Sequence, residues 1–172
     1  MSATTKPPHA QVVYPPQSGA GTYILLTGTA ALTAATAAFA TLSLGWLPWV
    51  MFMGWVAYFT RPSPAGGLQT FVCVVAGLAL GALATIAAGA LSPAMGPAAL
   101  PVVVFVVACA VIATRGMPAL NNLLGYFIGL ITFFAAHQEP GVGSVATLSA
   151  TISVGFVAGF LSQKVEALFR KQ

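Results

Sequence analysis

Long apolar segments, separated by short stretches rich in proline and glycine, fill the chain from residue 23 to residue 162. Hydrophobic residues make up 58% of the 172 residues and charged residues only 5%, whereas about a quarter of the residues of a soluble domain are charged. So few charged side chains cannot cover the surface of a folded chain in water. The composition therefore excludes a soluble globular domain and predicts an all-α, multi-pass membrane protein that forms one domain.

Six of the apolar segments are candidates for membrane crossings. A spanning helix needs about 20 apolar residues, because each residue adds about 1.5 Å and the hydrocarbon core is about 30 Å thick. The second segment is short by this measure and would need flanking residues to complete a crossing. The six segments are Tyr23–Leu44, Trp46–Phe59, Leu68–Leu91, Leu100–Thr114, Pro118–Ala136 and Val145–Ser162.

The positions of the basic residues favour six crossings. With the N-terminus in the cytoplasm and six crossings, every Lys and Arg falls on the cytoplasmic side. Five crossings would leave either Arg61 and Arg115 or the C-terminal cluster outside. Since cytoplasmic loops are enriched in Lys and Arg, we predict six transmembrane helices with both termini in the cytoplasm. The basic residues are Lys6, Arg61, Arg115, Lys164, Arg170 and Lys171.

Polar segments flank the apolar region at both ends. Residues 1–21 are rich in proline and lack the continuous apolar run of a secretory signal. We expect them to form a disordered cytoplasmic tail. Residues 22–163 are then the six-helix transmembrane domain, and residues 164–172 are a basic cytoplasmic tail.

Part of the sequence recurs. The stretch GWVAYF at positions 54–59 returns as GLITFF at positions 129–134, and the glycine pair at positions 77 and 81 returns at positions 155 and 159. The second and third predicted helices therefore resemble the fifth and sixth. Because three crossings in each half would turn the second half upside down, the pattern predicts an inverted 3+3 repeat. Such repeats are common in channels and transporters.

Small residues recur every four positions in two predicted helices. In lipid, helices associate through small residues that let their backbones approach closely. Close packing, within one chain or between chains, explains this spacing, and the lining of a narrow pathway is the alternative. The glycines to which we assign helix packing are Gly77, Gly81, Gly155 and Gly159.

Polar side chains inside the predicted crossings are candidates for the lining of a pathway. Asn121 and Asn122 follow Pro118, which suits the first turn of a helix, and are therefore predicted to lie inside the fifth helix. They could bond to a neighbouring helix or cap the fifth helix, or they could contact a polar solute. The candidate pathway-lining residues are Asn121, Asn122, Thr29, Thr33, Thr36, Thr147 and Thr151.

Catalytic and metal-binding chemistry has little support in the sequence. The two acidic residues, Glu139 and Glu166, both lie outside the predicted crossings, which argues against a proton-driven pump, although backbone carbonyls can bind sodium. The sequence offers no Ser–His or paired-Asp arrangement and no His-Glu-x-x-His motif. We expect no enzymatic activity, no cofactor and no metal. The scattered basic residues indicate no nucleic-acid partner.

The second predicted helix carries a set of residues that resembles a known family. The set reads Trp49-x-x-Phe52-x-Gly54-x-x-Ala57-Tyr58-Phe59-x-x-Pro62, followed by Gly66-Gly67-Leu68, and the fifth helix adds Gly125-x-Phe127-Ile128-Gly129. This pattern resembles the domain of unknown function 1097 family of small bacterial inner-membrane proteins. The resemblance implies a multi-pass fold in the bacterial cytoplasmic membrane, and it implies no activity. Its motif residues are Trp49, Phe52, Gly54, Tyr58, Phe59, Gly125 and Gly129.

The leading functional hypothesis is a passive channel or facilitator for a small uncharged solute, because the predicted crossings contain no acidic residue but do contain Thr, Ser and Asn. The expected partners are the lipid bilayer, other copies of the chain in a homo-oligomer, and the neutral solute. The first alternative is a non-transporting membrane scaffold or accessory subunit. The second alternative is an ion-coupled transporter of small solutes.

Overall fold

The computed structural model describes residues 19–169, and this part of the chain is helical with no strand. Residues 1–18, which make up most of the predicted N-terminal tail, and residues 170–172 lie outside the described part. The predicted basic tail is helical as far as residue 169. The helices are α1 (Ala20–Ser43), α2 (Pro48–Phe59), α3 (Pro64–Met95), α4 (Ala99–Ala113), α5 (Leu123–Ala136) and α6 (Val142–Phe169). Short 3₁₀ turns at Gly96–Ala98 and Thr114–Gly116 flank α4.

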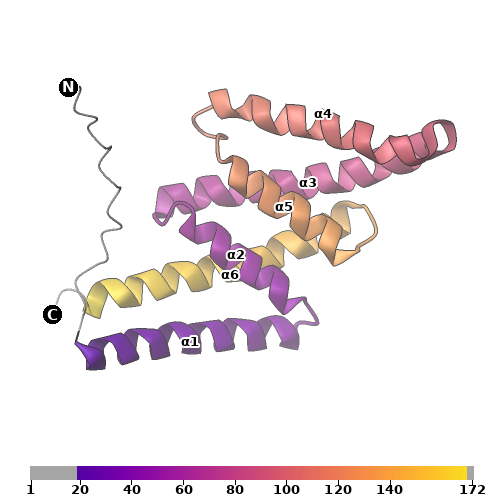
Figure 1. The fold of residues 1–172 in the computed structure, drawn as a ribbon. Helices are drawn as coiled ribbons and strands as arrows, with labels where there is room; N and C mark the ends of the chain where they lie inside the picture. Colours follow the sequence, from indigo (N-terminus) through magenta and orange to yellow (C-terminus); the bar gives the residue numbers. More distant parts are fainter. Residues whose placement is uncertain (1–18, 170–172) are drawn as a thin grey trace, which may run out of the picture.

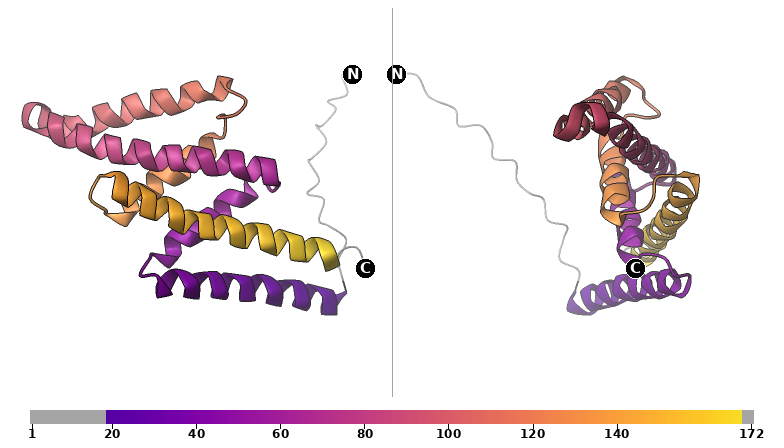
Figure 2. Two further views of the ribbon diagram at one scale, coloured as in Figure 1. Left: turned by 180° about the vertical axis from the view of Figure 1, so that it is seen from behind. Right: turned by 90° about the vertical axis from the view of Figure 1, so that its right-hand side faces the viewer.

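Helices α1, α6, α3 and α4 lie side by side in that order, and the shorter α2 and α5 cross them obliquely (Figures 1 and 2). Helix α2 packs mainly against α6, and α5 packs mainly against α3. The outer helices are attached in the same way, because α1 packs along α6 and α4 packs along α3. The start of α1 and the end of α6 lie at the same end of the bundle (Figure 1).

Local sequence explains where several helices begin and end. Helices α2 and α3 both begin with proline, which suits the first helical position because its missing N–H would have no partner there. The Ser63 hydroxyl accepts a hydrogen bond from the Gly66 N–H and so caps α3. Gly96, with φ of +54°, ends α3. His137 ends α5 in the left-handed conformation, with φ of +49°.

The apolar helices are those of a membrane protein. Three stretches are long and apolar enough to span a bilayer, namely Ala20–Ser43, Pro64–Gly116 and Val142–Leu168. The second of these contains both α3 and α4. Helices α2 and α5 have 12 and 14 residues, so each extends only about 20 Å, less than the roughly 30 Å of the hydrocarbon core. The count of six crossings therefore stays a prediction.

Three basic residues mark one end of the bundle. Arg61 lies between α2 and α3, Arg115 between α4 and α5, and Lys164 near the end of α6, and these three parts of the chain lie at the same end (Figure 1). We call this the basic end. The opposite end holds the α1–α2, α3–α4 and α5–α6 connections, including the exposed side chains of His137 and Glu139.

The largest hydrophobic core lies where α2, α3, α5 and α6 meet. Its buried residues are Val50, Ala57, Tyr58, Val74, Leu78, Ala82, Ile128, Phe133, Leu148, Ile152 and Phe156. Because these four helices supply the whole cluster, the structure of the centre depends on how α2 crosses α6 and how α5 crosses α3.

Candidate functional site

Glycines allow the backbones of α2 and α6 to touch where the two helices cross. A Cβ atom added to Gly54 would overlap the carbonyl group of Ile152, and one added to Gly155 would overlap the carbonyl oxygen of Met51. One turn further along α6, a Cβ on Gly159 would lie 3.0 Å from the ring of Tyr58. No larger residue fits at Gly54 or Gly155 without separating the helices.

The crossing of α3 and α5 has the same construction. A Cβ added to Gly129 would overlap the carbonyl oxygen of Val74, and one added to Gly77 would overlap that of Tyr126. A Cβ on Gly81 would lie 2.8 Å from the Cβ of Phe133. The four glycines assigned to helix packing, Gly77, Gly81, Gly155 and Gly159, thus all lie in contacts within one chain.

The two crossings use corresponding residues of the sequence. The sequence repeat matches α2 to α5, with Gly54 matched to Gly129, and it matches α3 to α6, with Gly77 matched to Gly155. Gly129 contacts Val74, and Gly54 contacts Ile152. The same alignment matches Val74 to Ile152.

The second pair of glycine contacts follows this repeat alignment as well. Gly77 meets Tyr126 and Gly155 meets Met51, and the alignment matches Met51 of α2 to Tyr126 of α5. The contacts of these glycines therefore correspond between the two crossings. The glycines of both crossings are covered by helices of the same chain. The homo-oligomer stays a prediction, and its copies would have to contact each other through another face of the bundle.

Asn122 connects three helices at the basic end. It is buried, and its Oδ1 accepts a hydrogen bond from the Gly125 N–H at 3.2 Å. Its Nδ2 donates to Thr70 Oγ1 at 2.7 Å and to Thr60 Oγ1 at 3.2 Å. The prediction that Asn122 lies inside the fifth helix is wrong, because α5 begins at Leu123. Asparagine is a preferred N-cap, and here its side chain replaces the missing partner of a backbone N–H.

Asn121 also precedes α5 and faces the α2–α3 turn. Its Oδ1 accepts a hydrogen bond from Arg61 Nη2 at 2.9 Å. Arg61 Nη1 donates to Gln69 Oε1, and Gln69 Nε2 donates to the carbonyl oxygen of Pro118. Arg61 and Gln69 therefore link the connection before α5 to the beginning of α3. The acceptors of the Arg61 guanidinium are neutral side chains.

A third link at the basic end joins α2 to α6. The Tyr58 hydroxyl donates to Gln163 Oε1, and Gln163 Nε2 donates to the carbonyl oxygen of Pro62 at 2.7 Å. Within residues 19–169, the side-chain hydrogen bonds that link separate helices all lie at this end. Sequence reasoning did not single out the glutamines or Thr60 and Thr70. Their only local signal is that they are polar residues close to turns or near the end of α6.

The predicted pathway threonines are not gathered around the asparagines. The hydroxyls of Thr29, Thr33, Thr36 and Thr151 donate to carbonyl groups of their own helices. Thr33 and Thr36 border a groove between α1 and α6, whereas Thr147 is exposed on α6. The structure therefore distributes these hydroxyls over separate parts of the bundle.

Ser149 is a polar residue that sequence reasoning missed. Its hydroxyl oxygen is buried and has no hydrogen-bond partner. Serine in a helix usually bonds to a carbonyl of the preceding turn, so nothing in the sequence marks Ser149 as different from Ser153. Ser153 donates to the carbonyl oxygen of Ala150 at 2.6 Å.

The family-motif residues fall into two groups. Gly54, Tyr58, Gly125 and Gly129 are buried at the crossings, and a Cβ on Gly125 would lie 3.0 Å from the Cβ of Cys73. The aromatic residues of α2 are at the surface instead, with exposed side chains at Trp49, Phe52 and Phe59. The glycines of the motif therefore set the distance between helices, while its outer aromatic side chains face the surroundings of the bundle.

The chain has the features of a multi-helix membrane protein. Its helices are apolar, they cross through glycine contacts, and the hydrogen bonds that link them lie at one end. The chain belongs to the family described as protein of unknown function (DUF1097), whose family model matches residues 28–167. This match confirms the family resemblance predicted from the second and fifth helices. Comparisons with curated proteins and with solved structures returned no match.

Proposed function

We propose that the chain forms two inverted three-helix halves, α1–α3 and α4–α6, which together make a passive channel or facilitator for a small uncharged solute. The observation that carries this proposal is that the glycine contacts of the two crossings correspond under the repeat alignment. Inverted repeats in membrane proteins commonly form a pathway at the interface of their halves. Here that interface is where α2 meets α6 and α3 meets α5.

The proposed topology has six crossings with both termini in the cytoplasm of a bacterial cell. Successive helices run back and forth between the two ends of the bundle (Figures 1 and 2), and the enrichment of cytoplasmic loops in Lys and Arg supports a cytoplasmic basic end. Reporter fusions at Arg61, Pro93, Arg115 and Gly141 should alternate between inside and outside, beginning inside. Any other order contradicts the six-crossing topology.

An uncharged solute fits the chemistry of the helices. The described acidic residues lie in the α5–α6 connection and near the end of α6, so no carboxylate is available in the central part to bind a cation. Ser149 offers a buried hydroxyl without a partner. It lies one turn before Ser153, which borders the beginning of α3, and residues four apart share a helix face. We therefore assign Ser149 as the polar group that contacts the solute between α6 and α3.

Stopped-flow light scattering on proteoliposomes tests this function. The solutes are water, glycerol, urea and short amides, with a salt as the control for leakage. We expect faster entry of at least one neutral solute, no salt conductance, and a changed rate in Ser149→Ala. The matched control, Ser92→Ala, alters an exposed serine of α3 and should behave as wild type. No acceleration from folded, inserted protein would contradict transport and favour the non-transporting scaffold.

A further inference from the structure

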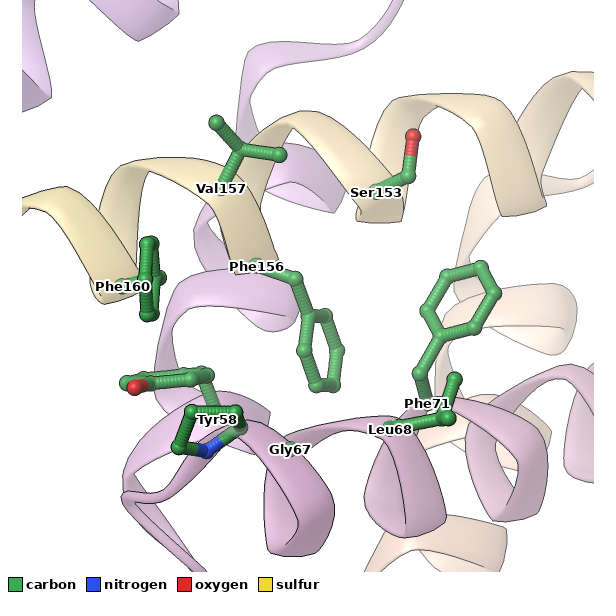
Figure 3. A pocket seen from close by; sticks show the side chains of 9 residues that line it. Tyr58, Gly67, Leu68, Phe71, Ser153, Phe156, Val157 and Phe160 are labelled. Atoms are coloured by element: carbon green, nitrogen blue, oxygen red, sulfur yellow. The ribbon is translucent and has the colours of Figure 1, made fainter.

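An apolar groove of about 280 Å³ lies at the basic end between α6 and the beginning of α3, beside the end of α2 (Figure 3). Gly67 helps to form it, because a Cβ there would lie 3.0 Å from the ring of Tyr58. The side chains that form most of its wall are Tyr58, Leu68, Phe71, Phe156, Val157 and Phe160.

The groove opens to the outside of the bundle. Leu68 is 66% exposed and Val157 is 57% exposed, although both are apolar and both line the groove. Deeper in, the ring of Phe156 makes edge-to-face contacts with those of Tyr58 and Phe71. On a membrane protein, an apolar groove with apolar rims faces lipid chains rather than water.

The polar groups of the wall are already engaged. The Tyr58 hydroxyl donates its hydrogen to Gln163, and the Ser153 hydroxyl donates its hydrogen to the carbonyl oxygen of Ala150. The groove therefore presents rings and aliphatic side chains and no free hydroxyl hydrogen. Its occupant must be apolar along the length that the groove encloses.

A basic side chain lies beside this groove at the basic end. Lys164 Nζ lies 5.4 Å from the centre of the Phe160 ring, which is part of the wall. Of the two acidic residues in the chain, Glu139 is at the opposite end of the bundle. Glu166 is two positions from Lys164 on α6, and residues at that spacing do not face each other on a helix. The charge of Lys164 is thus available to an anion beside the groove.

From this combination we infer that the groove holds one acyl chain of an anionic phospholipid, whose phosphate group binds Lys164. The cytoplasmic leaflet is rich in anionic lipids, which attract basic side chains at the membrane surface. The apolar groove would bind the acyl chain of the lipid, and Lys164 would bind its negatively charged headgroup. This inference requires only that the basic end faces the cytoplasmic leaflet, and it does not depend on transport.

Native mass spectrometry of the full chain, with added dioleoyl phosphatidylglycerol or dioleoyl phosphatidylcholine, tests the inference. We expect one retained phosphatidylglycerol and weaker retention of phosphatidylcholine. Lys164→Gln should lower the affinity for phosphatidylglycerol about fivefold, the effect of one basic side chain at an anionic surface, and Lys164→Arg should preserve it. Ser153→Phe, which fills the groove, should weaken retention of both lipids, whereas Ser92→Phe on exposed α3 surface should not.

Equal retention of the two lipids by the wild type would overturn the inference, and so would wild-type binding in Ser153→Phe. A dimer that Ser153→Phe abolishes would also overturn it, because a second copy would then cover the groove. Thermal unfolding in detergent checks that each variant is folded. If Ser153→Phe does not fold, Val157→Phe at the exposed rim replaces it, with the same expected loss of both lipids.

Discussion

The α2/α6 crossing and the α3/α5 crossing share their glycine contacts but differ in the residues around them. In the α3/α5 crossing, Asn122 bonds to Thr70 just before α5 begins. The corresponding positions of the other crossing, by the repeat alignment, are Leu47 and Leu148. There Leu148 is buried in the main core and Leu47 packs against that core. A hydrogen bond in one crossing thus takes the place of an apolar contact in the other.

At the other end of each crossing the difference is reversed, because here the α2/α6 crossing has the hydrogen bond. Tyr58 of α2 bonds to Gln163 of α6 at the basic end, whereas the corresponding residues at the opposite end are Phe133 and Thr85. Phe133 has no hydroxyl, and Thr85 bonds to the Gly81 carbonyl of its own helix. The comparison teaches that glycine sets the geometry of both crossings, while the side chains that link helices depend on the end of the bundle.

Adding a methyl group at the crossings should have the largest effect. Gly54→Ala and Gly129→Ala each place a Cβ on a facing carbonyl group, so we expect each to lower the free energy of unfolding by about 3 kcal/mol, the upper range for overpacking. Thermal unfolding in detergent measures it. Gly28→Ala and Gly89→Ala are controls, because a Cβ there meets open space. A large loss of unfolding free energy in only one of the two variants would show that the two crossings do not depend on their glycines in the same way.

Replacing Asn122 should have the next largest effect. Asn122→Leu copies Leu47 of the other crossing, and it removes an N-cap worth about 1 kcal/mol and an interhelical hydrogen bond worth about 0.6 kcal/mol. The double variant with Thr70→Val should lose less than the sum of the two single losses, because the hydrogen bond between Asn122 and Thr70 can be lost only once. Unfolding curves of the two single variants and the double variant give the coupling energy. Additive losses would contradict a direct Asn122–Thr70 interaction.

Removing the hydroxyl of Tyr58 should have a smaller effect. Tyr58→Phe makes this position equal to Phe133, and we expect a loss of about 0.6 kcal/mol, the average for a hydrogen bond between membrane helices. Gln163→Leu should cost a similar amount, and the double variant should cost less than the sum of the two. Since residues in contact couple in this way, independent effects would show that the Tyr58–Gln163 bond does not form.

The smallest change is expected at the opposite end. His137 ends α5 with a positive φ, which costs a residue with a side chain about 1–2 kcal/mol, while glycine loses roughly 0.5–1 kcal/mol of entropy on folding. His137→Gly should therefore raise the free energy of unfolding by about 0.5 kcal/mol. His137→Ala should give no gain, because alanine carries the same strain. A stabilising effect of alanine would point to the loss of the imidazole instead.

The sequence predicted the features of the fold that depend on short-range patterns. Apolar segments and turn residues located the helices, and glycine spacing located the contacts of Gly77, Gly81, Gly155 and Gly159. The start of α5 was misplaced because Pro118 and Asn122 both favour a helix start, and only the structure shows that Asn122 has acceptors in Thr60 and Thr70. The links through Gln69 and Gln163 could not be predicted, because they depend on which helices become neighbours.

The pairing of α2 with α6 has a consequence for the order in which the chain assembles. As the protein is made from its N-terminus, α5 emerges after its partner α3, whereas α2 emerges long before α6. Gly54 of the short α2 therefore has no partner helix until the ribosome has passed residue 159. A chain truncated before α6 lacks the Ile152 backbone against which Gly54 packs, so we expect α2 to stay without its main partner until α6 is in place.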